Sequence, residues 1–342
     1  MNSLASRSLH HLPPMRRFLL PFAVLAATFV ISNVFAQSVV TDPVGFYSAS
    51  ALTGKSLALS LSLDNTPANF SGPASAVTAS TVMTNSAGWT VNAFGPFASN
   101  PHIIRILSGT GVGQQFRIAS NTADTLTLTT NGTDLTTVMA AGNRYEILTT
   151  NTLASVFGAT GTGLLTNADP QQADNVLINI GTGWLTFFND GTKWLRVSGG
   201  TASQNNVAIL PEQAVLFVRR GATDLPLTVV GSVPTTNLIT PLPANKSTFL
   251  ANRFPVDTTL VGLGLSSLPG WTPGSDPNTA DNVLLNIGTG WLTYYYDGTK
   301  WLRVSGGTGA QNPTIKTGSA VLIVRRAGSD IVYNQPLPYV LN

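Results

Sequence analysis

Cysteine is absent from all 342 residues, and histidine and glutamate are scarce. Without cysteine the chain has no disulfide framework, no thiol chemistry and no site for a lipid-modified cysteine anchor. Of the three histidines, His10 and His11 lie near the start of the chain. His102 alone cannot supply the three nitrogen or sulfur ligands that a zinc site normally needs. These absences exclude thiol enzymes and the usual zinc sites.

Charged residues are also few, at 10% of the chain. Three arginines fall within residues 1–36, where there is no acidic residue, and without them 15 basic residues stand against 15 acidic ones. The rest of the chain is therefore formally neutral. This balance gives no support for nucleic acid or an anionic membrane surface as a partner.

Residues 1–36 have the pattern of a signal peptide. An arginine pair precedes an apolar run over residues 18–34, and small residues lead to a cleavage point after Ala36. The alternative is an uncleaved membrane anchor, but the run is short for a span of ~20 residues and is interrupted by Pro21. We predict export, with no membrane span after cleavage. A start at Met15 would give a leader of ordinary length.

A long internal repeat dominates the rest of the chain. The segment Ala168 to Asn205 matches Ser275 to Asn312, and both contain a stretch that reads GWLT, then FFN or YYY, then DGTKWLRVSGG. Both copies continue to a strand-like run that ends in paired arginines, AVLFVRR and AVLIVRR. The unit is a duplicated module.

The repeat and its flanking segments predict the domain organisation. Runs such as HIIRIL, QQFRIA and TLTLTT have strand length and are separated by turns rich in Gly, Asn and Asp. We predict an all-β fold of tandem duplicated β-modules, of sandwich or barrel type, with a small inserted β-domain. The predicted ranges are 37–69 with 151–232 for the first module, 70–150 for the insertion and 233–342 for the second module.

The Asp-Gly pair inside each repeat predicts a β-hairpin. With Asp297-Gly298 as the centre of a type I′ turn, Tyr294 would lie opposite Trp301, and the first copy would pair Phe187 with Trp194. Both hairpin faces carry large apolar side chains, so packing is the first interpretation. The alternative is a platform on which sugar rings stack. Its candidate residues are Trp184, Trp194, Trp291, Trp301 and Tyr294.

A loop reading DPxxADN precedes each hairpin and offers oxygen ligands for calcium. Ca²⁺ takes six to eight oxygens, but this spacing fits no EF-hand, and Asp-Pro and Asp-Asn are also ordinary turn formers. No other cofactor is indicated. The candidate ligands are Asp169, Asp174, Asn175, Asp276, Asp281 and Asn282.

Catalytic patterns are weak, and we predict that the protein is not an enzyme. No G-x-S-x-G elbow is present for a serine nucleophile. Hydrolysis by paired carboxylates stays open as an alternative, with a polysaccharide as substrate, but the two glutamates, Glu146 and Glu212, lie outside the repeat. We therefore name no candidate catalytic residue.

Several motifs resemble a family of exported bacterial proteins that is best represented in verrucomicrobial lineages. These motifs are the opening TDPVGF, the stretch SGTGVGQQFRIASNTADTLTL, and the closing ADNV with YYYDGTKWLRVSGG. The resemblance implies export and a β-rich fold, and it carries no established activity. We expect a non-catalytic structural or adhesive protein of the periplasm, cell surface or extracellular space, with envelope or surface proteins or glycans as partners. A glycan-binding module is the alternative.

Overall fold

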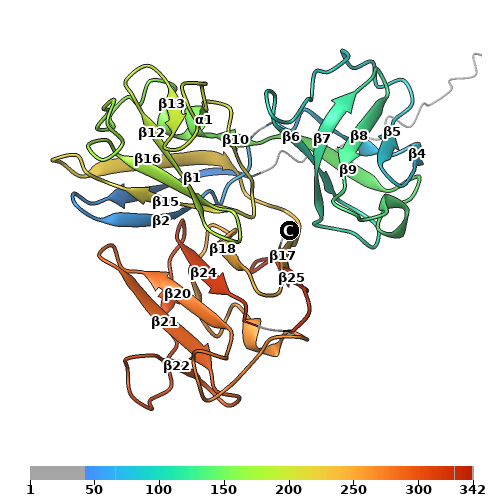
Figure 1. The fold of residues 1–342 in the computed structure, drawn as a ribbon. Helices are drawn as coiled ribbons and strands as arrows, with labels where there is room; N and C mark the ends of the chain where they lie inside the picture. The colour runs from blue at the N-terminus through green and yellow to red at the C-terminus, as the bar shows by residue number, and fades with distance from the viewer. Residues whose placement is uncertain (1–42, 66, 327, 341–342) are drawn as a thin grey trace, which may run out of the picture. The chain divides into compact units, whose positions relative to one another are not determined.

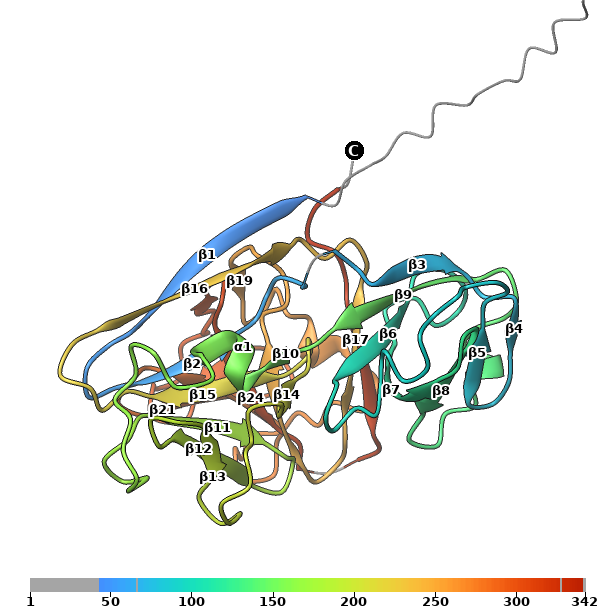
Figure 2. The ribbon, with the colours of Figure 1, turned by 90° about the horizontal axis from the view of Figure 1, so that it is seen from above.

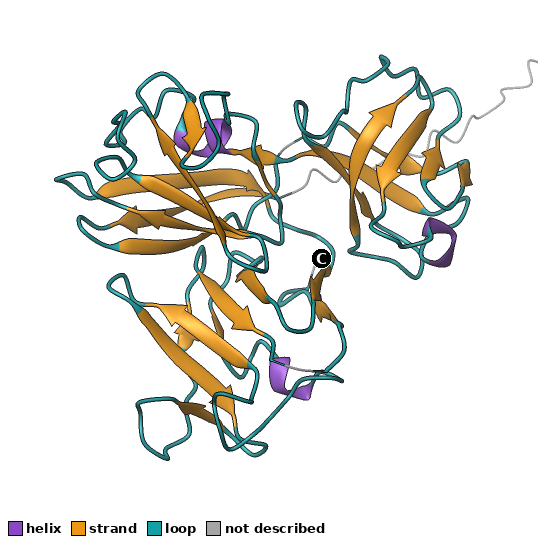
Figure 3. Ribbon diagram, viewed as in Figure 1, coloured by secondary structure: helices purple, strands orange, loops and turns teal. Residues whose placement is uncertain are grey.

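Antiparallel strands form almost all of the regular structure in the computed structural model (Figure 3), so the predicted all-β fold class is confirmed. The structure describes residues 43–340, apart from residues 66 and 327. The predicted leader over 1–36 therefore lies outside the described residues. Among those that are described, no helix has the length and apolar character that crossing a membrane would require.

Seven strands between Phe70 and Thr149 form one curled sheet (Figure 1). Alternation explains its core: β8 reads TLTLT, with its leucines buried and its threonines facing outward. The edge strands β3 and β4 are separated in the chain by only residues 74 and 75, so the sheet nearly closes on itself. In spatial order the strands are β3 (Phe70–Pro73), β9 (Arg144–Thr149), β6 (His102–Ile106), β7 (Gln115–Asn121), β8 (Thr125–Thr129), β5 (Thr81–Met83) and β4 (Ala76–Val77).

Two five-stranded sheets contain the repeated hairpins, and their strands follow one another in matching order. The first consists of β13 (Trp194–Arg196), β12 (Trp184–Asn189), β11 (Asn175–Asn179), β15 (Ala214–Val218) and β2 (Ser56–Ser60). The second consists of β22 (Trp301–Arg303), β21 (Trp291–Tyr296), β20 (Asn282–Asn286), β24 (Ala320–Val324) and β18 (Ser247–Ala251).

Two separate two-stranded ribbons accompany each five-stranded sheet. The longest of these ribbons, β1–β16, is best seen in Figure 2. The ribbons are β1 (Val44–Ala51) with β16 (Leu225–Ser232), β10 (Asn151–Thr152) with β14 (Ala208–Ile209), β17 (Leu238–Leu242) with β25 (Ile331–Gln335), and β19 (Thr258–Thr259) with β23 (Thr314–Ile315). The helical pieces are α1 (Leu153–Phe157), η1 (Leu135–Thr137) and η2 (Leu265–Ser267).

The strands of the two five-stranded sheets and of their ribbons follow one another along the chain in the same order. We call β1, β2, β10, α1 and β11 to β16 the first module, and β17 to β25 with η2 the second module. The curled sheet β3 to β9 falls between β2 and β10 of the first module, over the segment for which an insertion is predicted, and is called the inserted domain.

The apolar run AVLFV in β15 is explained by burial on both of its faces. Val215 and Phe217 belong to the core of the first module, whereas Ala214 and Leu216 pack in a separate cluster with Phe249 of the second module. Alternate residues of a strand point to opposite faces, so a strand between two apolar layers needs a continuous apolar sequence. The matching run AVLIV in β24 occupies the corresponding place in the second module.

The predicted hairpin register is wrong by two residues. Tyr296 pairs with Trp301 and Tyr294 with Arg303, so the loop contains four residues instead of two. The Asp297 carboxylate accepts hydrogen bonds from the backbone N–H of Thr299 at 2.7 Å and of Lys300 at 2.8 Å, which closes the longer loop. A shift of two residues keeps every side chain on its predicted face.

A buried ion network joins the first module, the inserted domain and the second module. Asp64, which follows β2, pairs with Arg105 of β6 at 2.7 Å and with Arg253, which follows β18. Arg105 also pairs with Glu146 of β9 at 2.7 Å. All four side chains are almost fully buried. Removing one partner from such a network leaves an uncompensated buried charge, so the network fixes how the three parts meet.

Candidate functional site: paired clefts between the modules

The two modules contact each other through an apolar layer between their five-stranded sheets. Its buried members include Ala58, Leu216, Phe249 and Ala320. The rings of Trp184 and Trp291 meet the edges of Phe249 at centroid distances of 5.3 and 5.9 Å. Small residues let the sheets approach closely, and the three rings fill the remaining space.

Polar contacts at the border of this layer are reciprocal. Ser56 of the first module donates its backbone N–H to the carbonyl of Gly288 at 2.8 Å, and its hydroxyl accepts a hydrogen bond from Asn286 at 2.9 Å. A positive φ of 85° at Gly288 shapes the β20–β21 turn that presents this carbonyl.

The second module makes the corresponding contacts in the opposite direction. Ser247 donates its backbone N–H to the Gly181 carbonyl at 2.9 Å, and its hydroxyl accepts a hydrogen bond from Asn179 at 3.0 Å. Gly181 has a φ of 86°. The repeated sequence NIGTG therefore supplies equivalent docking turns on both modules. Such reciprocity is the arrangement of an isologous dimer, here within one chain.

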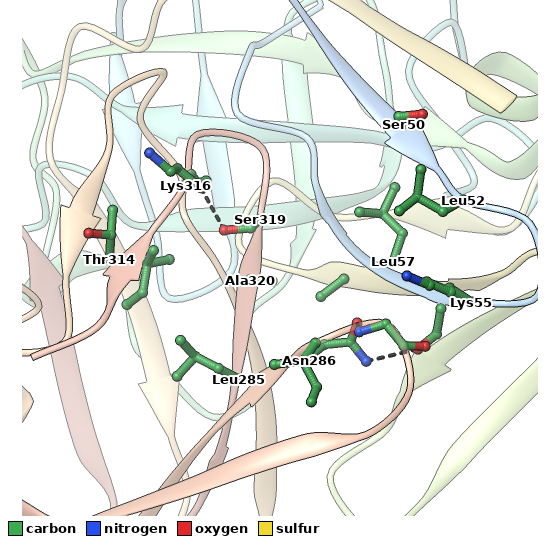
Figure 4. A pocket seen from close by; sticks show the side chains of 15 residues that line it. Ser50, Leu52, Lys55, Leu57, Leu285, Asn286, Thr314, Lys316, Ser319 and Ala320 are labelled. Atoms are coloured by element: carbon green, nitrogen blue, oxygen red, sulfur yellow. Dashed lines mark hydrogen bonds between the residues drawn. The ribbon is translucent and has the colours of Figure 1, made fainter. Parts of the chain in front are cut away.

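A cleft lies on each side of this contact. The first cleft has a volume of about 300 Å³ and is lined by residues that include Lys55, Leu57, Leu285 and Lys316 (Figure 4). Lys316 is held by an ion pair with Asp257 at 2.8 Å, whereas Lys55 has no polar side-chain contact among the described residues. Among the residues that the structure describes, no acidic side chain lines this cleft.

The second cleft has a volume of about 410 Å³ and differs chemically from the first. It is lined by Glu212 of the first module, Lys246 and Phe249 of the second, and Arg117 of the inserted domain. An adjoining hollow of about 130 Å³ also contains Arg117 and Glu212, together with Gln115. All three parts of the chain therefore contribute side chains to one cavity.

Polar groups of the second cleft and of the adjoining hollow differ in how far they are satisfied. Burial raises the pKa of the Glu212 carboxyl above its ordinary value, which a backbone hydrogen bond and the charge of Arg117 only partly oppose. The Arg117 guanidinium lies 5.0 Å from the ring centre of Phe97. Both polar atoms of the Gln115 amide are buried without a hydrogen-bond partner. Unpaired buried polar atoms are costly, so the adjoining hollow has unused hydrogen-bonding capacity at Gln115.

The predicted aromatic residues are divided between the module cores and the contact between modules. Trp194, Trp301 and Tyr294 are 0%, 3% and 3% exposed and pack inside their modules. Stacking a sugar needs an exposed ring face, which these three rings do not offer. Trp184 and Trp291 are half-buried at the contact with Phe249.

The predicted calcium ligands Asp174 and Asp281 bind arginine instead of lying open. Asp281 accepts hydrogen bonds from Arg325 Nε at 2.8 Å and from the backbone N–H of Arg326 at 2.7 Å. Asp174 is held in the same way by Arg219 and by the backbone N–H of Arg220. Charge-assisted hydrogen bonds of this kind occupy the oxygens that a cation would need.

The other predicted calcium ligands serve the loops in which they occur. Asp169 and Asp276 each accept a hydrogen bond from the backbone N–H two residues later at 2.8 Å. Asn175 and Asn282 each donate to a proline carbonyl at 3.0 Å. Within residues 43–340 no group of three or more His, Asp or Glu side chains is placed to hold a metal ion. Calcium binding stays a prediction without support from this geometry.

Sequence reasoning did not identify Glu212, Arg117 and Gln115 as site residues. One signal was available: PEQAVL in the first copy stands where TGSAVL stands in the second, so Glu212 replaces Gly318 within three differing residues directly before the shared AVL. Arg117 and Gln115 carry no comparable signal, because only folding brings the inserted domain beside Glu212. The chain matches no protein-family model, no curated protein and no solved structure.

Proposed function

We propose that this protein is an exported, non-catalytic structural or adhesive component of the cell envelope or extracellular space. The observation that carries the proposal is how its charged and aromatic side chains are used. Asp64, Asp174 and Asp281 each bind arginine in the interior. Of the hairpin rings, Trp194, Trp301 and Tyr294 fill the module cores, and Trp184 and Trp291 pack at the contact between the modules. Side chains used in this way stabilise the fold, and few carboxylates and aromatic rings are left to contact a substrate.

The clefts support a non-catalytic role over a polysaccharide hydrolase. Glycoside hydrolysis commonly uses two carboxyl groups that flank the scissile bond. The two clefts hold one carboxylate between them, that of Glu212. Partners of such a protein would be envelope or surface proteins or glycans.

The test is to express the full chain, with a C-terminal tag and its own leader, in a Gram-negative host and to fractionate the cells. We expect the tag in the periplasm, outer membrane or medium, and N-terminal sequencing should find a chain that begins at Gln37. Retention of the intact chain in the cytoplasm would overturn export. Turnover of a soluble polysaccharide by the purified protein would overturn the non-catalytic role.

A further inference from the structure

The second cleft has the volume and the chemical character of a small-molecule site. Its volume of about 410 Å³ lies within the ~300–1,000 Å³ that ligand pockets occupy. Its walls combine Phe249, Pro241 and Pro243 with polar side chains from three separate segments. Binding pockets usually combine an apolar wall with convergent polar groups, and in this cleft more than half of the lining residues are polar or charged, which suits a polar guest.

The charged side chains that line the cleft are of both signs, with Glu212 as a hydrogen-bond acceptor and Arg117 and Lys246 as donors. A charged guest of either sign would therefore meet at least one group of like charge. Arg117 and Glu212 form no close ion pair with each other among the described residues, so each can hydrogen-bond a guest. A neutral ligand with many hydroxyl groups meets both requirements, because each hydroxyl can donate to the carboxylate and accept from the guanidinium.

We propose that the second cleft binds a neutral saccharide of one or two rings. Glu212 and Arg117 hydrogen-bond the sugar hydroxyls, and the buried Gln115 amide lies in the wall of the adjoining hollow beside them. The apolar wall formed by Phe249 and Pro241 covers the C–H face of a ring. This assignment does not depend on where the protein is located or on its role in the envelope.

The first cleft provides a control within the same molecule. It lies at the corresponding turn of the other module, and its Lys55, Ser56 and Asn286 occupy the places that Lys246, Ser247 and Asn179 occupy in the second cleft. It contains no carboxylate and receives nothing from the inserted domain. A saccharide whose binding needs Glu212 and Arg117 should therefore not bind in the first cleft.

The experiment titrates the purified protein with cellobiose, maltose, mannobiose and N,N′-diacetylchitobiose, with digalacturonic acid as an anionic probe. Calorimetry gives the affinity, and the side-chain amide resonances of Gln115 report the location. We expect at least one neutral disaccharide to bind and to shift those resonances. Glu212→Gln and Arg117→Met should each weaken binding at least about tenfold. Lys55→Met should leave binding unchanged.

Three outcomes would overturn the proposal: no neutral disaccharide binds, digalacturonic acid binds more tightly than all of them, or Lys55→Met weakens binding as much as Glu212→Gln. Arg117 is exposed, so its variant stays informative if Glu212→Gln unfolds the protein. Thermal unfolding of each variant establishes that it is folded. Failure of export would appear in cell fractions and would leave binding by the purified protein unchanged.

Discussion

The carboxylate of Asp64 binds the guanidinium of Arg253 across the contact between the first and second modules, and both side chains are almost fully buried. Burial lowers the pKa of Arg253 to about 10. Because this value is still well above 7, the side chain stays charged at neutral pH. Asp64→Asn leaves Arg253 without a paired carboxylate and leaves Arg105 with that of Glu146 alone. We expect a loss of about 3–5 kcal/mol in the free energy of unfolding, measured by urea denaturation.

The matched control is the ion pair between Lys316 and Asp257, whose side chains are 73% and 46% exposed. Asp257→Asn should cost much less than Asp64→Asn, because exposed ion pairs are weakened by solvent. Equal losses for Asp64→Asn and Asp257→Asn would show that the buried network does not hold the three parts together.

A second prediction concerns Asp281 and calcium. Its carboxylate already accepts from Arg325 and from two backbone N–H groups, so Asp281→Asn should destabilise the protein by about 3–5 kcal/mol with or without added calcium. Excess calcium or EDTA should leave the thermal midpoint unchanged. The measurement is thermal unfolding in both media. A calcium-dependent rise in the midpoint that disappears in Asp281→Asn would instead establish a calcium site.

The hairpins show how far local sequence determines the structure. The alternation of side chains along each strand predicted which face of the hairpin each side chain occupies, and this prediction holds in the observed register. The register depended on the loop, where the Asp297 side chain bonds two backbone N–H groups and so favours four residues over two. A two-residue turn and this longer loop both suit Asp-Gly, so the sequence does not decide between them.

The second cleft shows what the sequence does not reveal. Glu212 and Arg117 are far apart in the chain, and they share a cavity only because the inserted domain docks beside both modules. No periodicity or spacing encodes that contact. Burial of Trp194 was easier to predict, because both faces of its hairpin carry apolar groups and leave little reason for an exposed ring.

A third prediction compares the two equivalent tryptophans. Trp194 donates its indole N–H to the Gly158 carbonyl at 2.8 Å, whereas the indole N–H of Trp301 is buried without a hydrogen-bond partner in the described part of the chain. Substitution by Phe removes similar ring volume at both sites. Trp194→Phe should therefore cost about 1 kcal/mol more than Trp301→Phe in urea denaturation, and the reverse order would contradict the structure.

A fourth prediction concerns His102, which is 7% exposed. Burial lowers the pKa of its imidazole below 6.5, although the Asn100 carbonyl opposes this effect. The unfolded chain therefore binds a proton before the folded one does, and stability falls as pH drops below about 6.5. His102→Gln should remove that part of the acid sensitivity. NMR titration of the wild-type imidazole checks the premise, and a pKa at or above 6.5 would contradict it.

The last prediction uses the raised pKa of Glu212. The folded chain keeps this proton to a higher pH than the unfolded chain does, so stability falls as pH rises from about 4.5 through the folded-state pKa. Glu212→Gln removes the cost of ionising a partly buried carboxyl and should stabilise the protein at about pH 7 but not at about pH 4. Urea denaturation at both pH values measures the difference.

Glu146→Gln is the control, because Glu146 is paired with Arg105 and its loss should destabilise the protein at neutral pH. If Glu212→Gln also destabilised the protein at neutral pH, the carboxylate would have a structural partner, and the second cleft would not be holding it free for a ligand.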